Sequence, residues 1–230
     1  MSYEKPNFTA DQQAQRWLDR RNIENLMGRR FSYKLLRQED LELKELWCKK
    51  AADPVLGFND GCYKGYDAIS GYFEALAKQA DERVGYAKAN YEALADKADS
   101  ELHGVGSLSP YTLTTPVIEI AADGQTAKGL WYIVGAASDI GKNGAEAAWY
   151  RGKLAADFVL EDGAWKIWHL LEISDVFCRA GTNWVGNELK AEDFAAADTA
   201  LPAKNAPAPA AKPGVPVPYG SFDSTFSYGV

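Results

Sequence analysis

Two Asp-Gly pairs, Asp123-Gly124 and Asp162-Gly163, constrain the fold of this chain more than any other feature of its sequence. Asp-Gly favours the left-handed backbone of a two-residue hairpin turn, and each pair lies between apolar, β-branched and aromatic runs. We therefore expect strands from about Tyr111 to Phe177, interrupted by a glycine-containing loop from Ser138 to Gly144. The pattern predicts three long antiparallel strands, and with helices before them an α+β fold.

A two-residue turn also determines which residues pair across a hairpin, and therefore which side chains share a face of the sheet. Around Asp123-Gly124 the predicted inner pairs are Ile120 with Ala127, Ile118 with Gly129, Pro116 with Trp131 and Thr114 with Ile133, with Glu119 opposite Lys128 outside. Around Asp162-Gly163 they are Leu160 with Trp165, Phe158 with Ile167, Ala156 with His169 and Tyr150 with Asp175. The more polar remaining set is predicted to face outward: Lys153, Asp157, Lys166, Trp168, Leu170 and Glu172. In that set, Trp168 and Leu170 suggest a subunit interface.

The N-terminal third has helical periodicity. We predict a helix from a cap at Asp11 to about Leu36, and a short second helix from Asp40 to Trp47. A small hairpin is expected between Val55 and Lys64, because turn residues separate its two apolar halves. A further helix is predicted from Tyr66 to about Ala95.

The chain divides into three parts by composition. Residues 1–11 are predicted to be an N-terminal arm, 12–186 the folded α+β domain, and 187–230 a C-terminal extension rich in Pro and Ala. Pro-rich sequence favours an extended linker. Because the extension ends in aromatic residues, we expect it to dock on its own body or on a neighbouring subunit.

Composition excludes several classes of function. The net charge of −7 disfavours binding to a phosphate backbone, so no nucleic-acid partner is expected. Three widely spaced cysteines and two histidines indicate a reducing compartment and no dedicated metal site. No apolar run approaches the roughly 20 residues that span a bilayer, and the segment from Met1 to Pro6 has no apolar signal-peptide core. We expect a cytoplasmic protein without a membrane partner.

Five short motifs occur in a recognisable order. They are Ile23-x-x-Leu26-Met27-Gly28-Arg29-Arg30, Gly61-x-Tyr63-x-Gly65-x-x-x-Ile69, Thr115-Pro116-Val117-Ile118-Glu119, Thr126-Ala127-Lys128-Gly129-x-Trp131, and the run from Asp157 to His169. With the order of elements, they make residues 12–178 resemble the SnoaL-like family of the nuclear transport factor two superfamily. The resemblance implies a cystatin-like cone, with helices packed in the concave face of a strongly curved antiparallel sheet.

The resemblance also implies a type of activity. The fold hosts many reactions, but similar enzymes include scytalone dehydratase, bile-acid dehydratase and aldol-type formaldehyde lyases of aromatic catabolism. These enzymes need no cofactor, and many are trimers. We therefore expect a cofactor-free lyase that removes water or a small carbonyl from a hydroxylated aromatic or polycyclic molecule. A homo-oligomer is expected, with a trimer favoured over a dimer.

Candidate catalytic residues follow from the predicted inner face and from the resemblance. His169 is predicted to be the general acid or base, because imidazole titrates near neutral pH, with Asp175 orienting it. Tyr63 matches the hairpin tyrosine of the dehydratases, and it would bind the leaving oxygen together with Tyr150. Arg30 stands where relatives often carry a tyrosine, and would stabilise negative charge.

Substrate contacts are expected from aromatic residues in or near the cone. They are Tyr33, Trp131, Tyr111, Phe58 and Trp47, of which Tyr111 stands where a histidine often precedes the strand in relatives. Trp131 would stack on the substrate.

Four alternatives stay open on sequence alone. His169 could be a hydrogen-bonded core histidine, and Arg30 could pair with an inner carboxylate such as Asp175. A double-bond isomerase of the ketosteroid isomerase type would need a carboxylate base, and Asp175 is the one predicted to face inward. A non-catalytic ligand-binding module is the fourth reading.

Overall fold

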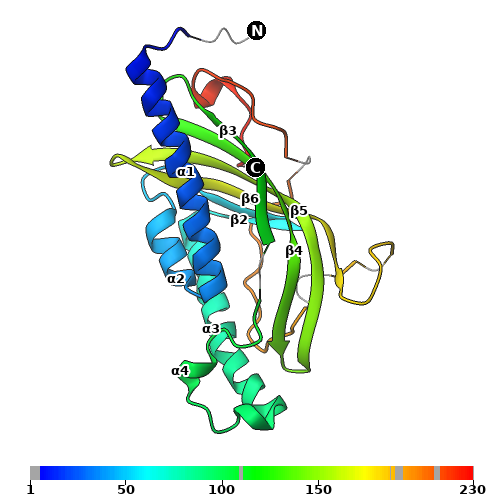
Figure 1. Cartoon of the computed structure of the whole chain (residues 1–230). Helices are drawn as coiled ribbons and strands as arrows, with labels where there is room; N and C mark the ends of the chain where they lie inside the picture. Colours follow the sequence, from blue (N-terminus) through cyan, green and yellow to red (C-terminus); the bar gives the residue numbers. More distant parts are fainter. Residues whose placement is uncertain (1–5, 109–110, 187, 190–193, 210–212, 230) are drawn as a thin grey trace.

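The computed structural model describes residues 6–108, 111–186, 188–189, 194–209 and 213–229 (Figure 1). Its helices are α1 (Ala10–Leu36), α2 (Glu39–Leu41), the π-helix η1 (Glu42–Leu46), α3 (Tyr66–Asn90), η2 (Glu92–Leu94), α4 (Asp99–Leu102) and η4 (Phe222–Ser224). Its strands are β1 (Val55–Phe58), β2 (Gly61–Lys64), β3 (Tyr111–Ile120), β4 (Thr126–Gly141), β5 (Gly144–Glu161) and β6 (Ala164–Arg179). Within these ranges, no helix is long and apolar enough to cross a bilayer.

The strands form one curved sheet in the order β2-β1-β6-β5-β4-β3. All neighbours are antiparallel except β1 and β6, which are parallel. Four long strands occur where the sequence predicted three, because β4 and β5 continue to the pair Gly141–Gly144. The prediction of a loop from Ser138 to Gly144 is therefore wrong. A connection of two residues joins β4 to β5 instead.

Helix ends differ from the prediction for local reasons. Thr9, not Asp11, caps α1. Its hydroxyl accepts a hydrogen bond from the Gln12 amide, and the side-chain oxygen of Gln12 accepts one from the Thr9 amide. The short helix predicted from Asp40 to Trp47 is a single α-turn followed by a π-helical turn. Helix α3 ends at Asn90, five residues before the predicted end at Ala95.

Helices and sheet enclose one large apolar core. Side chains of α1, η1 and α3 pack on the concave face of the sheet, against buried residues such as Leu154, Phe158 and Ile167. A second, smaller core lies on the convex face, where Leu130, Ala155, Leu171 and Ile173 contact Tyr228 of the C-terminal extension. The predicted cone fold is confirmed.

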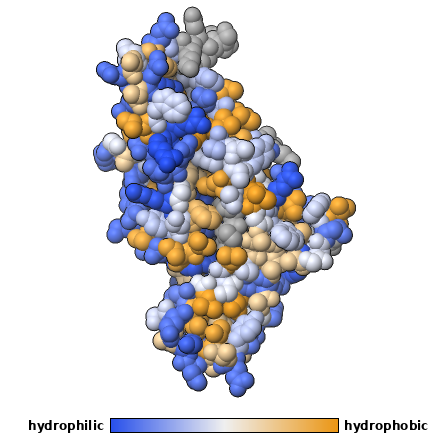
Figure 2. All heavy atoms as spheres, in the orientation of Figure 1, coloured by the Kyte–Doolittle hydropathy of each residue, from blue (hydrophilic) through white to orange (hydrophobic). Residues whose placement is uncertain are grey.

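Figure 2 shows polar and charged residues along most of α1, and apolar residues gathered at the end formed by α3 and α4.

The β3–β4 hairpin follows the predicted register only near its turn. Ile120 pairs with Ala127, Ile118 with Gly129 and Glu119 with Lys128, as predicted. A bulge then intervenes at Thr115, whose φ is 45°, and Pro116, which has no N–H to donate. Beyond it Leu113 pairs with Ile133, so the predicted pairs Pro116–Trp131 and Thr114–Ile133 are wrong.

The β5–β6 hairpin has two register shifts, and they change which side chains face the cone more than the bulge in the β3–β4 hairpin does. Leu160–Trp165 and Phe158–Ile167 pair as predicted, but Trp168 is then an extra residue, and Asp157 pairs with His169. The predicted pair Ala156–His169 is therefore wrong. Because strand side chains alternate, one extra residue exchanges the two faces of every residue beyond it.

After that first shift, Leu170 and Glu172, predicted to face outward, lie on the concave face, and His169 lies on the convex face. Leu170 is fully buried in the large core, so it belongs to no subunit interface. The second shift lies between Arg151 and Gly152, and it pairs Tyr150 with Phe177, not with Asp175 as predicted.

The C-terminal extension lies against its own chain. Ala206 bonds to Cys62 at the β2 edge of the sheet. Farther along, the carbonyls of Tyr219 and Gly220 accept the amides of Ala122 and Asp123, beside β3 and β4. The extension therefore runs from one edge of the sheet toward the other across its convex face.

Candidate active site

Four charged side chains meet on the concave face, and we call them the concave cluster: Arg30, Lys34, Glu42 and Glu172. The guanidinium of Arg30 lies 2.9 Å from Glu42 through Nε and 3.4 Å from Glu172 through Nη2. Lys34 Nζ lies 3.1 Å from the other oxygen of Glu172. Arg30, Glu42 and Glu172 are buried, whereas the side chain of Lys34 is 27% exposed. The cluster thus reaches solvent on its Lys34 side.

Local structure explains this convergence. Arg30 and Lys34 are one turn apart on α1, so they project from the same side of the helix. The π-helical turn η1 brings Glu42 to Arg30. Glu172 reaches the cluster because the bulge at Trp168 turns it inward. Arg30 therefore pairs with inner carboxylates, as one sequence alternative held, although its partners are Glu42 and Glu172 instead of Asp175.

Aromatic rings form a wall next to the concave cluster. The rings of Tyr63 and Tyr72 lie 5.0 Å apart, and Phe58 contacts both at 6.3 and 5.6 Å. Burial raises the pKa of Tyr63 to about 12. Burial, with the nearby charge of Glu172, raises the pKa of Tyr72 well above its usual value. Both phenols stay protonated at neutral pH and can donate a hydrogen bond, and Tyr63 donates one to the carbonyl of Pro202 at 2.8 Å.

His169 lies away from this site, on the convex face with Lys128 and Asp157. We call these three residues the convex cluster. His169 Nδ1 is 2.8 Å from one oxygen of Asp157, and Lys128 Nζ is 2.5 Å from the other. Trp168 stacks on the imidazole at 4.4 Å. The predicted inward orientation of His169 is wrong, and the structure does not bring it together with Arg30 and Tyr63.

The other predicted residues are spread over the fold. Trp131 and Trp47 are buried in the large core, where they contact Phe158 and Phe73. Tyr33 is half-buried, and its hydroxyl donates to Glu45 at 2.5 Å, which raises its pKa. Tyr150 packs on Phe177 at 5.8 Å, and Asp175 is exposed on β6. The side chain of Tyr111 lies outside the described part of the structure.

Sequence reasoning missed Glu42, Glu172 and Tyr72. Strict alternation of side chains along the strand predicts that Glu172 faces outward, because it takes no account of the bulge at Trp168. Tyr72 belongs to the apolar stripe of α3, and such a tyrosine resembles an ordinary core residue. A sequence signal did exist for Glu42, since it stands between Leu41 and Leu43 in a predicted amphipathic helix.

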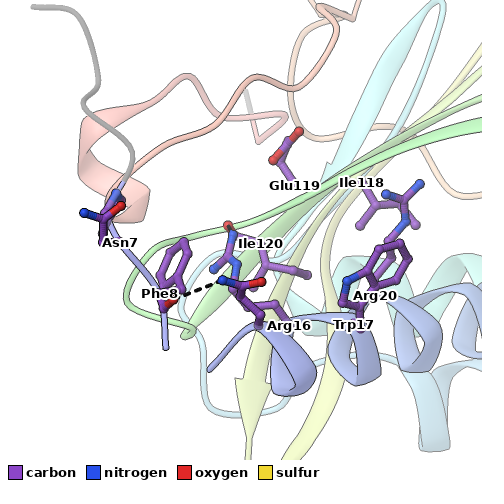
Figure 3. Close-up of a pocket in the computed structure, with 10 residues that line it drawn as sticks. Asn7, Phe8, Arg16, Trp17, Arg20, Ile118, Glu119 and Ile120 are labelled. Carbon is purple, nitrogen blue, oxygen red and sulfur yellow. Dashed lines mark hydrogen bonds between the residues drawn. The ribbon is translucent and has the colours of Figure 1, made fainter. Parts of the chain in front are cut away.

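Two surface hollows lie away from the concave cluster. One of about 650 Å³ is bounded by the N-terminal segment, α1 and β3, with Phe8, Trp17 and Arg20 among its lining residues (Figure 3). The other, of about 300 Å³, lies between η1 and α3 beside Lys44 and Tyr66. Among the described residues, no group of three or more His, Cys, Asp or Glu side chains could hold a metal ion.

Two solved structures of similar shape support the fold, and a third is less similar. The dehydrochlorinase LinA-type3 from Novosphingobium barchaimii LL02 is 15% identical, with a TM-score of 0.50, over 73% of this chain and 94% of that one. LinA itself is 14% identical with a TM-score of 0.50, over 73% and 94%. A putative scytalone dehydratase from Novosphingobium aromaticivorans is 11% identical, with a TM-score of 0.47 over 76% and 97%. At these identities, the likeness concerns the fold alone.

The sequence itself also matches a family. The search of curated proteins found no match to the chain. The SnoaL-like domain matches residues 15–170, which include most of α1, all of α2 to α4 and β1 to β5, and the first part of β6. The chain therefore belongs to the SnoaL-like family.

Proposed function

We propose that this chain is a cofactor-independent lyase that acts by acid–base chemistry on a hydroxylated aromatic or polycyclic small molecule. The observation that carries the proposal is Glu172, a buried carboxylate on the concave face between Arg30 and Lys34, beside two protonated tyrosines. A carboxylate base and a phenolic acid are the two groups that an elimination needs.

In a dehydration, Glu172 takes a proton from the carbon next to a carbonyl, and the electron pair forms the new double bond. The carbon–oxygen bond breaks, and Tyr63 or Tyr72 gives its proton to the departing hydroxide, which leaves as water. In a retro-aldol cleavage, Glu172 takes the hydroxyl proton, a carbon–carbon bond breaks, and the phenol protonates the carbanion. The ion pairs with Arg30 and Lys34 hold the Glu172 carboxylate in position.

A double-bond isomerase is the second candidate, and one observation favours it. Sequence alternation placed no carboxylate but Asp175 inside the cone, whereas the structure has Glu172 and Glu42 there. An isomerase would return the proton held by Glu172 to a different carbon of the same substrate, as in the ketosteroid isomerase example. The two candidates therefore share a base and differ in whether a fragment leaves.

A single assay separates the candidates. The full chain is incubated in deuterated buffer with phenolic β-hydroxy ketones and with β,γ-unsaturated ketones. The readouts are loss of water, release of formaldehyde and double-bond migration. Glu172→Gln should lower the rate by about 10²–10⁴, because it removes the base. The exposed residue Glu92 supplies the control, Glu92→Gln, which should retain the rate.

Two outcomes would overturn the lyase proposal. One is Glu172→Gln turnover equal to that of the unchanged chain. The other is ligand binding without any product, which would leave the non-catalytic reading. Glu172→Asp keeps the charge beside Arg30, and it tests the base if Glu172→Gln does not fold.

A further inference from the structure

A second group of buried charges lies farther along the concave side, and we call it the distal cluster: Arg37, Glu39, Arg83 and Asp139. They come from four different segments, the C-cap of α1, α2, α3 and the far part of β4. Each side chain is at least 86% buried, with exposed fractions of 10%, 5%, 14% and 7% in that order. None of the four belongs to the concave cluster.

Asp139 is the acceptor at the centre of this group. One of its oxygens lies 3.0 Å from Arg37 Nη2 and 2.7 Å from Arg83 Nε, and the other accepts the Ile140 amide at 2.9 Å. Arg37 also lies 3.9 Å from Glu39 through Nη1. The carboxylate of Asp139 is therefore fully engaged with the groups around it.

Arg83 has donors that this arrangement does not use. Its Nη1 group is buried, and it donates no hydrogen bond to any residue that the structure describes. Buried donors are almost always paired, because an unpaired one loses its bonds to water without replacement. A guanidinium presents its N–H groups in a planar fork that fits carboxylate and phosphate oxygens. The unpaired Nη1 of Arg83 is therefore a buried donor that can receive an acceptor oxygen which the described residues do not supply.

The charges around the site also suit an anion. Arg37 and Arg83 bring two guanidinium groups to the site, and burial raises the pKa of Glu39, which weakens the competition of that carboxyl group for them. Arg37 contacts the hydroxyl of Ser107, in the segment after α4. The cluster thus lies beneath this segment, at the end of the molecule where α4 and the end of α3 meet (Figure 1).

We propose that Arg83, with Arg37 beside it, binds the carboxylate or phosphate group of a small molecule. This assignment replaces the expectation that Arg30 meets a negative substrate group, because Arg30 is engaged by Glu42 and Glu172. That the anion belongs to the substrate rests on the proposed function, whereas anion binding itself does not.

The test uses the full-length chain with two probes, sodium benzoate and inorganic phosphate, against sodium chloride at equal ionic strength. Thermal unfolding and calorimetric titration should show binding of at least one probe, with Tm raised by about 2–4 °C. Stronger binding of benzoate identifies an aromatic carboxylate, and stronger binding of phosphate identifies a phosphate group. Arg83→Gln should abolish the shift. Arg20→Gln, at a partly exposed residue of α1 that pairs with Glu24, should retain it.

The proposal is overturned if neither probe binds the unchanged chain, or if Arg83→Gln binds as well as Arg20→Gln. Should Arg83→Gln not fold, Arg83→Lys keeps the charge and removes the fork, and it should weaken binding at least tenfold. In the unchanged chain, the Nε–H nuclear magnetic resonance of Arg83 must move during the titration. Failure of the lyase proposal is distinguishable, because Glu172→Gln should lose turnover and still bind the probe.

Discussion

The concave and convex clusters lie on opposite faces of one sheet, and β6 contributes Glu172 to the first and His169 to the second, yet the two clusters have opposite surroundings. On the concave face, Arg30 and Glu172 lie under helices, with Lys34 partly in solvent. On the convex face, Lys128 and Asp157 have no exposed side-chain surface. The concave charges reach solvent through Lys34, whereas the convex charges are enclosed by the protein's own C-terminal extension.

The enclosure of the convex cluster is aromatic. The ammonium of Lys128 lies between 4.7 and 5.9 Å from the ring centres of Tyr219, Phe222, Phe226 and Tyr228. Asp157 also accepts the Tyr228 amide at 2.7 Å, in addition to its bonds with Lys128 and His169. Cation–π contacts strengthen when the cation is desolvated, as it is here. The comparison teaches that buried polar groups attach the C-terminal extension on the convex face, whereas on the concave face they form the site for which we propose chemistry.

The largest expected effect comes from Asp157→Asn, which leaves Lys128 buried without a countercharge. Breaking one side of a buried ion pair lowers the free energy of unfolding by about 3–5 kcal/mol, measured by urea unfolding. The matched control is Asp162→Asn in an exposed turn, where Asn tolerates the φ of 52° and the change should stay within about 1 kcal/mol. Equal losses in both variants would mean that the convex cluster is not an attachment site.

Tyr228→Ala should have the next largest effect, because it removes a buried ring from the small convex core. We expect a loss of about 2–4 kcal/mol in the free energy of unfolding. Limited chymotrypsin digestion should also cleave the extension faster. Val217→Ala, at a residue that is 56% exposed, should change neither quantity. Unchanged cleavage in Tyr228→Ala would separate the extension from the convex face.

His169→Gln tests whether the two faces really have different purposes. The variant exchanges the hydrogen bond to Asp157 for a weaker one and removes the stacking on Trp168. The expected loss is about 1 kcal/mol of stability, with turnover on any substrate of Glu172 unchanged. A fall in turnover of 10² or more, measured with the assay above, would return His169 to the catalytic site.

The smallest effect concerns the pH dependence of stability on the concave side. Burial raises the folded-state pKa of Glu39 above its unfolded value, so the folded protein binds that proton more tightly. Its contribution to stability is fully present below the unfolded pKa, and it is lost as pH rises through the folded pKa. The difference in unfolding free energy between the unchanged chain and Glu39→Gln should therefore fall from pH 4 to pH 7, by less than about 1.4 kcal/mol per unit.

Urea unfolding across that pH range measures this difference. Glu92→Gln, at an exposed position, should follow the unchanged chain at every pH. A difference that grows with pH would show that Glu39 is stabilised as a carboxylate, and that the distal cluster is less cationic than proposed.

Local chemistry was enough to predict many of the helices, strands and turns of this protein from its sequence. Asp162-Gly163 specifies a hairpin turn by its own backbone preference, and the pairs Leu160–Trp165 and Phe158–Ile167 follow from it. The apolar period of α3 and the strand run from Tyr111 likewise need no distant partner to be recognised. The family motifs then led to the cone fold.

Only the tertiary structure decided which side chains enter the cone. Strict alternation turns His169 inward and Glu172 outward, and a single extra residue at Trp168 reverses both. That bulge is stabilised by partners far away in the sequence: Leu170 is buried under the helices, and Asp157 bonds to His169, Lys128 and the extension. A local pattern cannot show whether such a bulge will form, because its energy comes from contacts between segments that meet only in the folded chain.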